Sequence, residues 1–219
     1  MRLQPVFRTA PAVRRVPVCA EPLAVYECLY CSAPYAFLYE SLEGNQRRGR
    51  YSFIGGSPRL VFESRGGTVR LHRQNQRHTL TANPLEVLRQ LVGRTLDVPG
   101  VAPFVGGAVG YLGYDMVRFY ESIPNENPDD LQFPESLFIF PEEVIVFDHV
   151  AGETHLIVYA DTHENGRLDY MEQYVLASNR TASQTARNLV FSSPSRDTAP
   201  MSSRTSEPQF TEAVRRAKE

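Results

Sequence analysis

The stretch that decides the fold is Pro34–Gly56, PYAFLYESLEGNQRRGRYSFIGG. Two short apolar and aromatic runs, Ala36–Tyr39 and Tyr51–Ile54, flank a polar segment that is rich in arginine. Runs of this composition, bounded by turn residues, predict β-strands. The stretch therefore predicts two strands of one sheet, with the polar segment at the edge of that sheet.

Three kinds of polar side chain follow one another in this segment. An acid and a hydroxyl stand together at Glu40-Ser41, and Arg50 comes nine residues later. A carboxylate binds an ammonium group, a guanidinium binds a carboxylate, and a hydroxyl serves either. These residue types predict a site for a small zwitterion, and the alternative interpretation is a solvated turn. For Arg47 and Arg48 the solvated turn is the simpler interpretation.

Further short strands follow along the chain. We expect them at Arg59–Glu63, Thr68–His72, Arg77–Thr81, Leu137–Phe140, Glu143–His149 and Thr154–Ala160. Gly55-Gly56 and Gly66-Gly67 predict the turns between the first of them. In Thr68–His72 apolar residues alternate with charged ones, which indicates an antiparallel sheet with one face in water.

The spacing of apolar residues predicts helices between these strands. Two of them span Pro22–Cys31 and Arg167–Val190. A third follows Asn83, the predicted N-cap, with Glu86 completing a capping box and Gly93 ending the helix. Separate strands and helices predict an α+β fold, mainly an antiparallel β-sheet with packed helices.

Composition divides the chain into four parts. Residues 1–21 are polar and irregular and predict a loose N-terminal arm, and residues 22–190 predict the folded domain. Residues 191–207 are rich in serine, proline and threonine and predict a linker. Residues 208–219 begin an amphipathic helix without a partner core. Since a helix of about ten residues is marginal alone in water, we expect the start of a truncated second domain there.

Charge and hydropathy exclude several classes of protein. The formal net charge is −2, which argues against sequence-independent binding of nucleic acids. The N-terminal residues lack the apolar core of a secretory signal, and no run approaches the roughly 18 apolar residues of a membrane span. These observations predict a cytoplasmic protein.

Three other patterns are incomplete versions of known motifs. Cys28 and Cys31 have C-x-x-C spacing, but a structural zinc site needs four ligands and no second pair exists, so we expect reduced, partly buried thiols. The glycines of residues 104–114 lack the G-x-G-x-x-G spacing of a dinucleotide site and predict close packing of strand backbones. Asp148-His149 has no nucleophile beside it and predicts a strand end.

Four ordered blocks carry a family resemblance. They are Phe37–Ser41 (FLYES), Gly49–Gly55 (GRYSFIG), Gly106–Asp115 (GGAVGYLGYD) and Val144–His149 (VIVFDH). In this order they resemble the N-terminal part of anthranilate synthase component I, and the closing Phe210–Glu219 resembles the opening of that family's chorismate-binding domain. Aminodeoxychorismate synthase component I is a close sister by the same blocks.

The resemblance implies an enzyme that converts chorismate and ammonia to anthranilate and pyruvate in tryptophan biosynthesis, with Mg2+ as its cofactor. A glutamine amidotransferase subunit, component II, supplies the ammonia. In the family, the Mg2+ carboxylates and the acid–base groups belong to the C-terminal domain, which would begin near residue 208. The resemblance therefore implies no catalytic and no metal-binding residue in this chain, and we expect the chain to be inactive alone.

The same resemblance implies a feedback site for L-tryptophan. The family's Leu-Leu-Glu-Ser motif corresponds to Leu38–Ser41, so Glu40 and Ser41 are the expected effector contacts. Arg50 stands where some members carry a lysine that contacts the effector. Tyr39 replaces the second leucine, and its phenol either points away from the site or narrows it.

Two alternatives stay open at this point. The first keeps the enzyme class but changes the pathway, to aminodeoxychorismate synthesis for folate. The second is a free-standing module that binds an amino acid and has no chemistry of its own. Sequence beyond residue 219 that continues into a chorismate-binding domain would exclude the second.

Overall fold

The computed structural model describes most of the chain. The described residues are 3–18, 20–40, 49–73, 76–94, 98–125, 129–159, 164–185, 203 and 205–218. The chain separates into two compact units, Met1–Arg187 and Asn188–Glu219. The first unit holds the sheet and all the features that bear on the predicted site.

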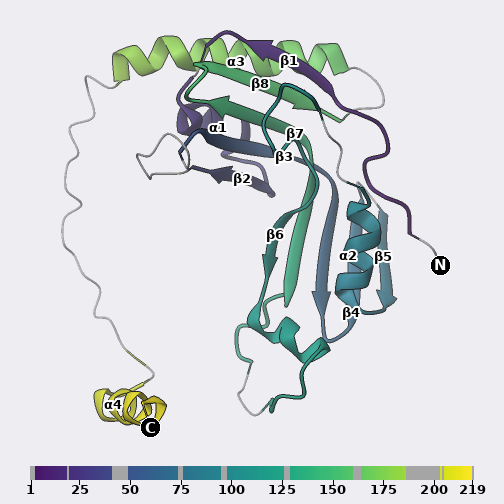
Figure 1. Cartoon of the computed structure of the whole chain (residues 1–219), viewed down its shortest axis with the longest axis vertical. Helices are drawn as coiled ribbons and strands as arrows, with labels where there is room; N and C mark the ends of the chain where they lie inside the picture. The colour runs from purple at the N-terminus through teal and green to yellow at the C-terminus, as the bar shows by residue number, and fades with distance from the viewer. Residues whose placement is uncertain are drawn as a thin grey trace. The chain divides into compact units, whose positions relative to one another are not determined.

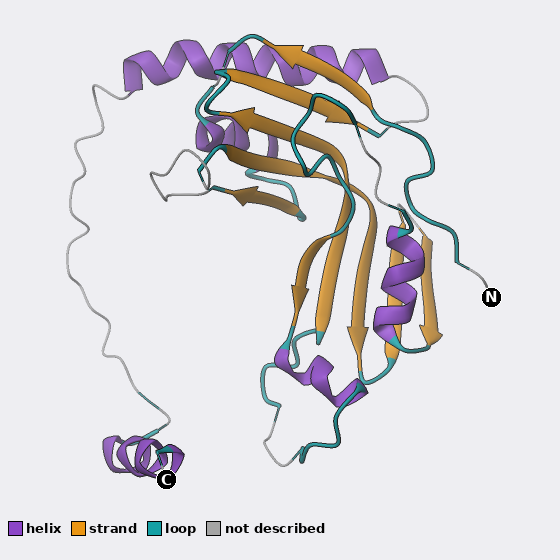
Figure 2. Cartoon of the chain, viewed as in Figure 1, coloured by secondary structure: helices purple, strands orange, loops and turns teal. Residues whose placement is uncertain are grey.

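An antiparallel sheet of eight strands forms the first unit (Figures 1 and 2). The strand order is β1-β8-β7-β3-β4-β5, with β2 added beside β3 and β6 beside β7. The strands are β1 Ala12–Val16, β2 Ala36–Tyr39, β3 Tyr51–Arg65, β4 Thr68–Arg73, β5 Gln76–Thr81, β6 Val109–Leu112, β7 Ser136–Asp148 and β8 Glu153–Val158. With the helices packed on it, this sheet confirms the predicted α+β class.

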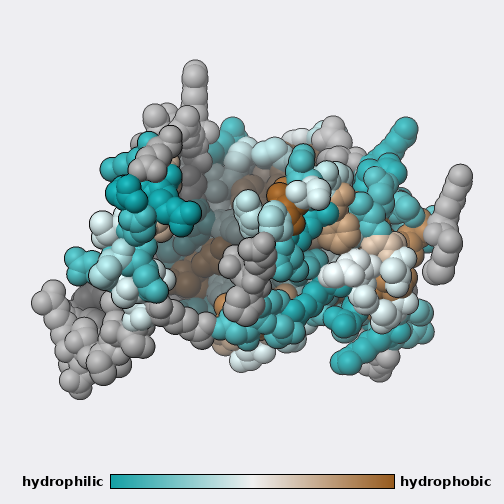
Figure 3. All heavy atoms as spheres, turned by 90° about the horizontal axis from the view of Figure 1, so that it is seen from below, coloured by the Kyte–Doolittle hydropathy of each residue, from teal (hydrophilic) through white to brown (hydrophobic). Residues whose placement is uncertain are grey.

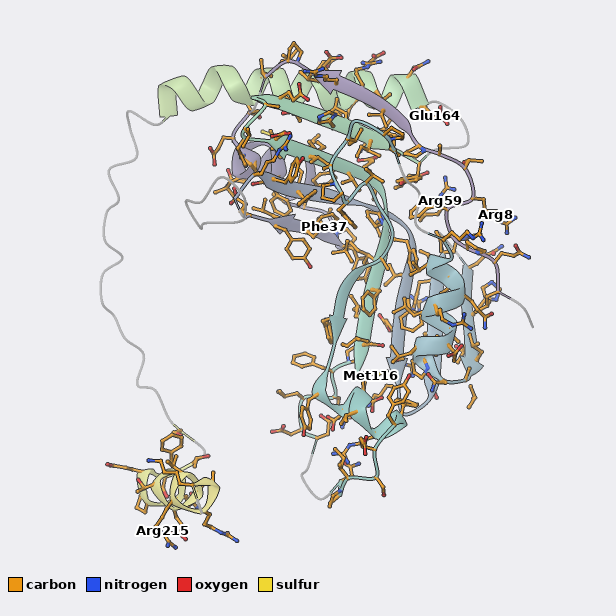
Figure 4. The ribbon with its side chains drawn as sticks, viewed as in Figure 1. Arg8, Phe37, Arg59, Met116, Glu164 and Arg215 are labelled. Atoms are coloured by element: carbon orange, nitrogen blue, oxygen red, sulfur yellow. The ribbon has the colours of Figure 1, made fainter. Side chains whose placement is uncertain are left out.

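The two longest strands, β3 and β7, bend sharply half-way and divide the sheet into two limbs (Figure 1). Pro58 and Pro141 face each other across the ladder, and the register shifts between Pro58 and Leu60. Proline has no N–H to give to a ladder, so a bulge and a bend are expected where two prolines meet. Arg59 lies at the bend (Figure 4) and binds the Glu142 carboxylate at 3.0 Å and the Tyr159 carbonyl.

The expected turn at Gly55-Gly56 is wrong, because both glycines lie inside β3. A Cβ atom on Gly55 would meet the Phe37 ring at 2.6 Å, and one on Gly56 would meet the Tyr30 ring at 2.6 Å. The glycines therefore serve close packing of aromatic rings rather than a turn. The expectation of two separate strands before and after Pro141 is also wrong. They form one strand, β7, which continues through the proline.

The N-terminal residues are also more ordered than expected. Instead of a loose arm, Ala12–Val16 form edge strand β1, which pairs with β8, and Val6 and Phe7 are buried. Arg14 anchors this strand to helix α3 (Glu164–Thr185) through two carboxylates, at 2.6 and 2.8 Å. The strand is short and contains two arginines, so its composition alone does not mark it as part of a sheet.

Three helices cover the sheet at two places. α1 (Pro22–Tyr30) and α3 (Glu164–Thr185) pack together on the limb that contains β1 and β8, and α2 (Pro84–Val92) lies beside β4 and β5 (Figure 2). The Asn83 side chain caps α2 by accepting from the N–H groups of Leu85 and Glu86, as predicted. The second half of the predicted capping box is replaced by an ion pair, because the Glu86 carboxylate binds Arg89.

Two further helices complete the described structure. The 3-10 helix η1 (Tyr114–Phe119) follows β6 at the far end of the sheet, and its Met116 side chain is buried near that end (Figure 4). In the second unit, α4 (Glu207–Ala217) begins with a complete capping box between Ser206 and Gln209 and buries none of its residues. The domain boundaries expected from composition stay a prediction.

Candidate functional site

Three strand ends meet at one corner of the sheet. β3 begins with Tyr51 paired to Asp148, the last residue of β7, and β2 ends with Tyr39 paired to Phe53. The end of β2, the start of β3 and the end of β7 therefore lie side by side. This corner holds two of the three predicted site residues.

Arg50 forms the central contact of this corner. Its Nε lies 3.1 Å from both carboxylate oxygens of Asp148, and its Nη2 lies 2.7 Å from Oδ2. The Asp148 side chain is 5% exposed, whereas the Arg50 side chain is 45% exposed. A two-point bond between a guanidinium and a carboxylate fixes the plane of the guanidinium as well as its position. The guanidinium also lies over the Tyr51 ring, 4.9 Å from its centroid.

Asp148 is fixed from the other side by the backbone of the turn that follows it. Its Oδ1 accepts hydrogen bonds from the N–H groups of Val150 at 3.1 Å and Ala151 at 3.0 Å. The hydrogen bonds from Arg50, together with these backbone bonds, lower the pKa of the Asp148 carboxyl below its usual value. Sequence reasoning identified Asp148 only as a strand end. The signal that could have found it is an aspartate directly before a glycine-containing turn.

A second polar pair lies next to this one. The buried Ser52 hydroxyl is 2.8 Å from Nε2 of His149, and the His149 backbone N–H donates to the Arg50 carbonyl at 2.9 Å. The pair closes the corner between β3 and β7. Ser52 is 2% exposed, so its hydroxyl is not accessible to a substrate as a nucleophile.

Glu40 follows β2 at the same corner and is exposed. Continuing the β2–β3 register by one residue beyond Tyr39 places Glu40 opposite Ser52. The structure thus brings Glu40 and Arg50 to one corner, without a contact between them among the described residues. Ser41 lies outside the described residues.

Tyr39 is directed toward a different surface. Its ring packs against Phe37, with 5.5 Å between the centroids, and half of the residue is exposed. Its ring also lines an apolar recess between β2 and β6. Of the two orientations that the sequence left open, the structure has the one in which the phenol points away from the predicted site, because the ring faces Phe37 and the recess between β2 and β6.

An apolar recess lies between β2 and β6. Two adjoining cavities, of about 330 and 400 Å³, share Tyr39, Val109 and Gly110 in their walls. Phe37 points into this side of the sheet (Figure 4), and hydrophobic atoms are exposed on the face of the molecule that is seen from below (Figure 3). The predicted close packing of the glycine segment is confirmed here, because a Cβ atom on Gly110 would lie 1.9 Å from the Leu137 carbonyl oxygen.

A second buried carboxylate belongs to the interior of the fold. Glu143 of β7 accepts from the Tyr30 hydroxyl at 3.0 Å and binds Arg167 of α3 through Nε and, at 2.7 Å, through Nη2. Burial, with the adjacent Glu143 charge, raises the pKa of the Tyr30 hydroxyl well above its usual value. This cluster ties α1 and α3 to the sheet, with Tyr30 and Glu143 buried and Arg167 partly exposed at its rim.

Other functional classes find little support in the described part of the chain. It contains no group of three or more histidine, cysteine, aspartate or glutamate side chains that could hold a metal ion. Cys28 and Cys31 are exposed, which corrects the expectation of partly buried thiols. Within the same residues, no helix has both the length and the hydropathy to cross a membrane.

Comparison with known proteins gives consistent results. The model of the chorismate binding enzyme family matches residues 71–219. Anthranilate synthase component 1 of Acetivibrio thermocellus is 40% identical over 147 residues, which cover 66% of this chain and 29% of the relative. The protein of the same name from Thermus thermophilus is 39% identical, covering 71% and 32%, and that from Bacillus caldotenax is 37% identical, covering 83% and 36%.

Among solved structures, the crystal structure of anthranilate synthase component I from Streptococcus pneumoniae TIGR4 is similar, with a TM-score of 0.46 and 22% identity. It matches 74% of this chain and 34% of the solved chain. This chain thus spans about a third of the length of the relatives it matches. The sequence matches confirm the resemblance to anthranilate synthase component I. Because the family model covers more than half of its residues, the chain belongs to the family of chorismate binding enzymes.

Proposed function

We propose that this chain is the N-terminal regulatory and scaffold part of an anthranilate synthase component I. The whole enzyme would convert chorismate and ammonia to anthranilate and pyruvate in tryptophan biosynthesis, with a glutamine amidotransferase subunit as the source of ammonia. The observation that carries this proposal is the 37–40% identity to three relatives that bear this name. The same names favour anthranilate over aminodeoxychorismate as the product.

The regulatory role proposed here is binding of L-tryptophan at the corner formed by β2, β3 and β7. The exposed Glu40 would take the ammonium group of the amino acid, and the half-exposed Arg50 would take its carboxylate. Ser41 would add a hydroxyl next to Glu40. Opposite charges on neighbouring strands suit a zwitterion better than a simple anion or cation.

The scaffold role is supported by the apolar recess between β2 and β6. Two aromatic residues that line it, Tyr39 and Tyr111, are about half exposed in this chain. Exposed apolar surface of this kind usually marks an interaction site. The relatives are about three times as long as the aligned part, so we propose that the rest of the enzyme packs here.

We propose that Mg2+ binds to the part of the enzyme outside this chain. Mg2+ prefers several oxygen ligands in octahedral geometry, and the described residues contain no cluster of three carboxylates that fits this need.

The function is tested with the full-length protein, chorismate, ammonia and Mg2+. The expected product is anthranilate, identified by its fluorescence and mass, and L-tryptophan should inhibit its formation. The 219-residue chain alone, assayed in parallel, should form none at any ammonia or Mg2+ concentration. Formation of aminodeoxychorismate by the full-length protein, or turnover by the chain alone, would contradict the proposal.

A further inference from the structure

We propose that Asp148 is a positioning residue that holds the Arg50 guanidinium ready to bind the carboxylate of an amino-acid effector. This inference rests on the proposed function, because it concerns the same site. It adds a residue that would not touch the effector itself and would act only through Arg50.

The Arg50 guanidinium binds Asp148 through one edge and leaves its other edge available for a ligand. The bonds to Asp148 use Nε and Nη2, while Nη1 takes part in no hydrogen bond among the described residues. A guanidinium carries five N–H groups in a rigid fork, so one carboxylate can hold it while another binds its outer edge. The 45% exposure of the Arg50 side chain leaves room for the second carboxylate.

The bonds to Asp148 also restrict the conformational freedom of the Arg50 side chain before any ligand binds. A long arginine side chain loses much rotamer entropy when it binds a ligand, and that loss weakens binding. Because Asp148 already fixes the Arg50 fork in the free protein, less freedom remains to be lost on binding. The orientation is also defined, which a lysine at this position could not achieve with its single point charge.

Asp148 is itself held in place by burial and by hydrogen bonds to the backbone. The Asp148 carboxylate is 5% exposed and is held by the N–H groups of Val150 and Ala151. The adjacent pair of Ser52 and His149, at 2.8 Å, joins the same two strands beside it. The position of Asp148 at the sheet corner is therefore well defined, and its hydrogen bonds define the position of the Arg50 guanidinium.

The test uses the full-length protein and the variant Asp148→Asn. Asparagine keeps the Oδ1 acceptor for the two turn N–H groups but lacks the second oxygen and the charge that hold Arg50. Calorimetry with L-tryptophan should then show binding about tenfold weaker than in the wild type, the loss expected for a charged hydrogen bond. Tryptamine, which has no carboxylate, should bind both proteins equally well, and Arg50→Lys should behave like Asp148→Asn.

Glu143→Gln serves as the matched control, because it also neutralises a buried carboxylate of β7 that is paired with an arginine. It should lower the melting temperature and leave L-tryptophan affinity unchanged. The inference is overturned if Asp148→Asn binds L-tryptophan within twofold of the wild type, or if it weakens L-tryptophan and tryptamine equally. A wild-type protein that binds no L-tryptophan would instead overturn the proposed function, and this inference with it.

Discussion

Asp148 occupies the end of β7 with a nearly buried carboxylate that one guanidinium and two backbone N–H groups approach. A carboxylate surrounded by donors is more stable ionised than protonated, which is why its pKa is lowered from 3.8 in the folded chain. The group therefore adds stability at any pH above its unfolded pKa. That contribution is lost as the pH falls through the folded pKa.

This linkage predicts how Asp148→Asn changes stability with pH. Near neutral pH the wild-type chain should be more stable than the variant, by an amount that does not vary between pH 7 and 5. Below about pH 4 the difference should shrink, because the wild-type carboxyl becomes protonated while asparagine does not titrate. Urea unfolding of both proteins at several pH values measures the difference. A gap that stays constant down to pH 2.5 would show that the charge of Asp148 does not stabilise the fold.

Residue chemistry predicted part of this corner and missed the rest. Glu40 and Arg50 were predicted because their types and spacing suggested a zwitterion site, and the strand pairing brings both to this corner, while the site itself stays a prediction. Asp148 was not assigned to it, since it lies far from Arg50 in sequence and has the pattern of a strand end. Pairing between β3 and β7 joins positions almost a hundred residues apart. No local pattern encodes that register.

Among the elements, those with strong local signals were predicted well. β2 and the N-terminal end of α2 lie where the sequence places them, because an apolar run and an Asn-Pro cap are local features. β3 and β7 were each predicted as two short strands. Their glycines and prolines are ordinary turn signals, and only the rings of Tyr30 and Phe37 explain why Gly55-Gly56 remain extended.

Close packing of β6 on β7 leads to a prediction at the element scale. In Gly110→Ala the new Cβ would lie 1.9 Å from the Leu137 carbonyl oxygen and 2.7 Å from the Phe138 Cα, both backbone atoms that cannot rotate away. We expect a loss of about 1–3 kcal/mol in the free energy of unfolding, typical of overpacking.

The control for this prediction is Gly166→Ala in α3, where a Cβ meets no atom within 4 Å. Alanine is the better helix former, so stability should rise by up to about 1 kcal/mol. Thermal unfolding of both variants gives the comparison. Equal effects in the same direction would contradict the close approach of β6 to β7.

At the scale of the whole molecule, two surfaces of the first unit are candidate binding surfaces. The corner of β2, β3 and β7 presents the exposed Glu40 and the half-exposed Arg50, and the recess between β2 and β6 exposes the rings of Tyr39 and Tyr111. The relatives continue far beyond the aligned part. A regulatory site and a packing surface on one sheet would let effector binding influence the rest of the enzyme.

The most direct test of the proposed feedback site is the inhibition of anthranilate formation by L-tryptophan, measured with the full-length enzyme. The proteins are the wild type, Glu40→Ala and Ser41→Ala, with Glu86→Ala on α2 as an exposed acid remote from the corner. The account predicts that both site variants need at least about tenfold more L-tryptophan for half-inhibition, because each loses a hydrogen bond to a charged ligand. The control should be inhibited like the wild type. Unchanged inhibition of Glu40→Ala and Ser41→Ala would contradict the assignment of the feedback site to this corner.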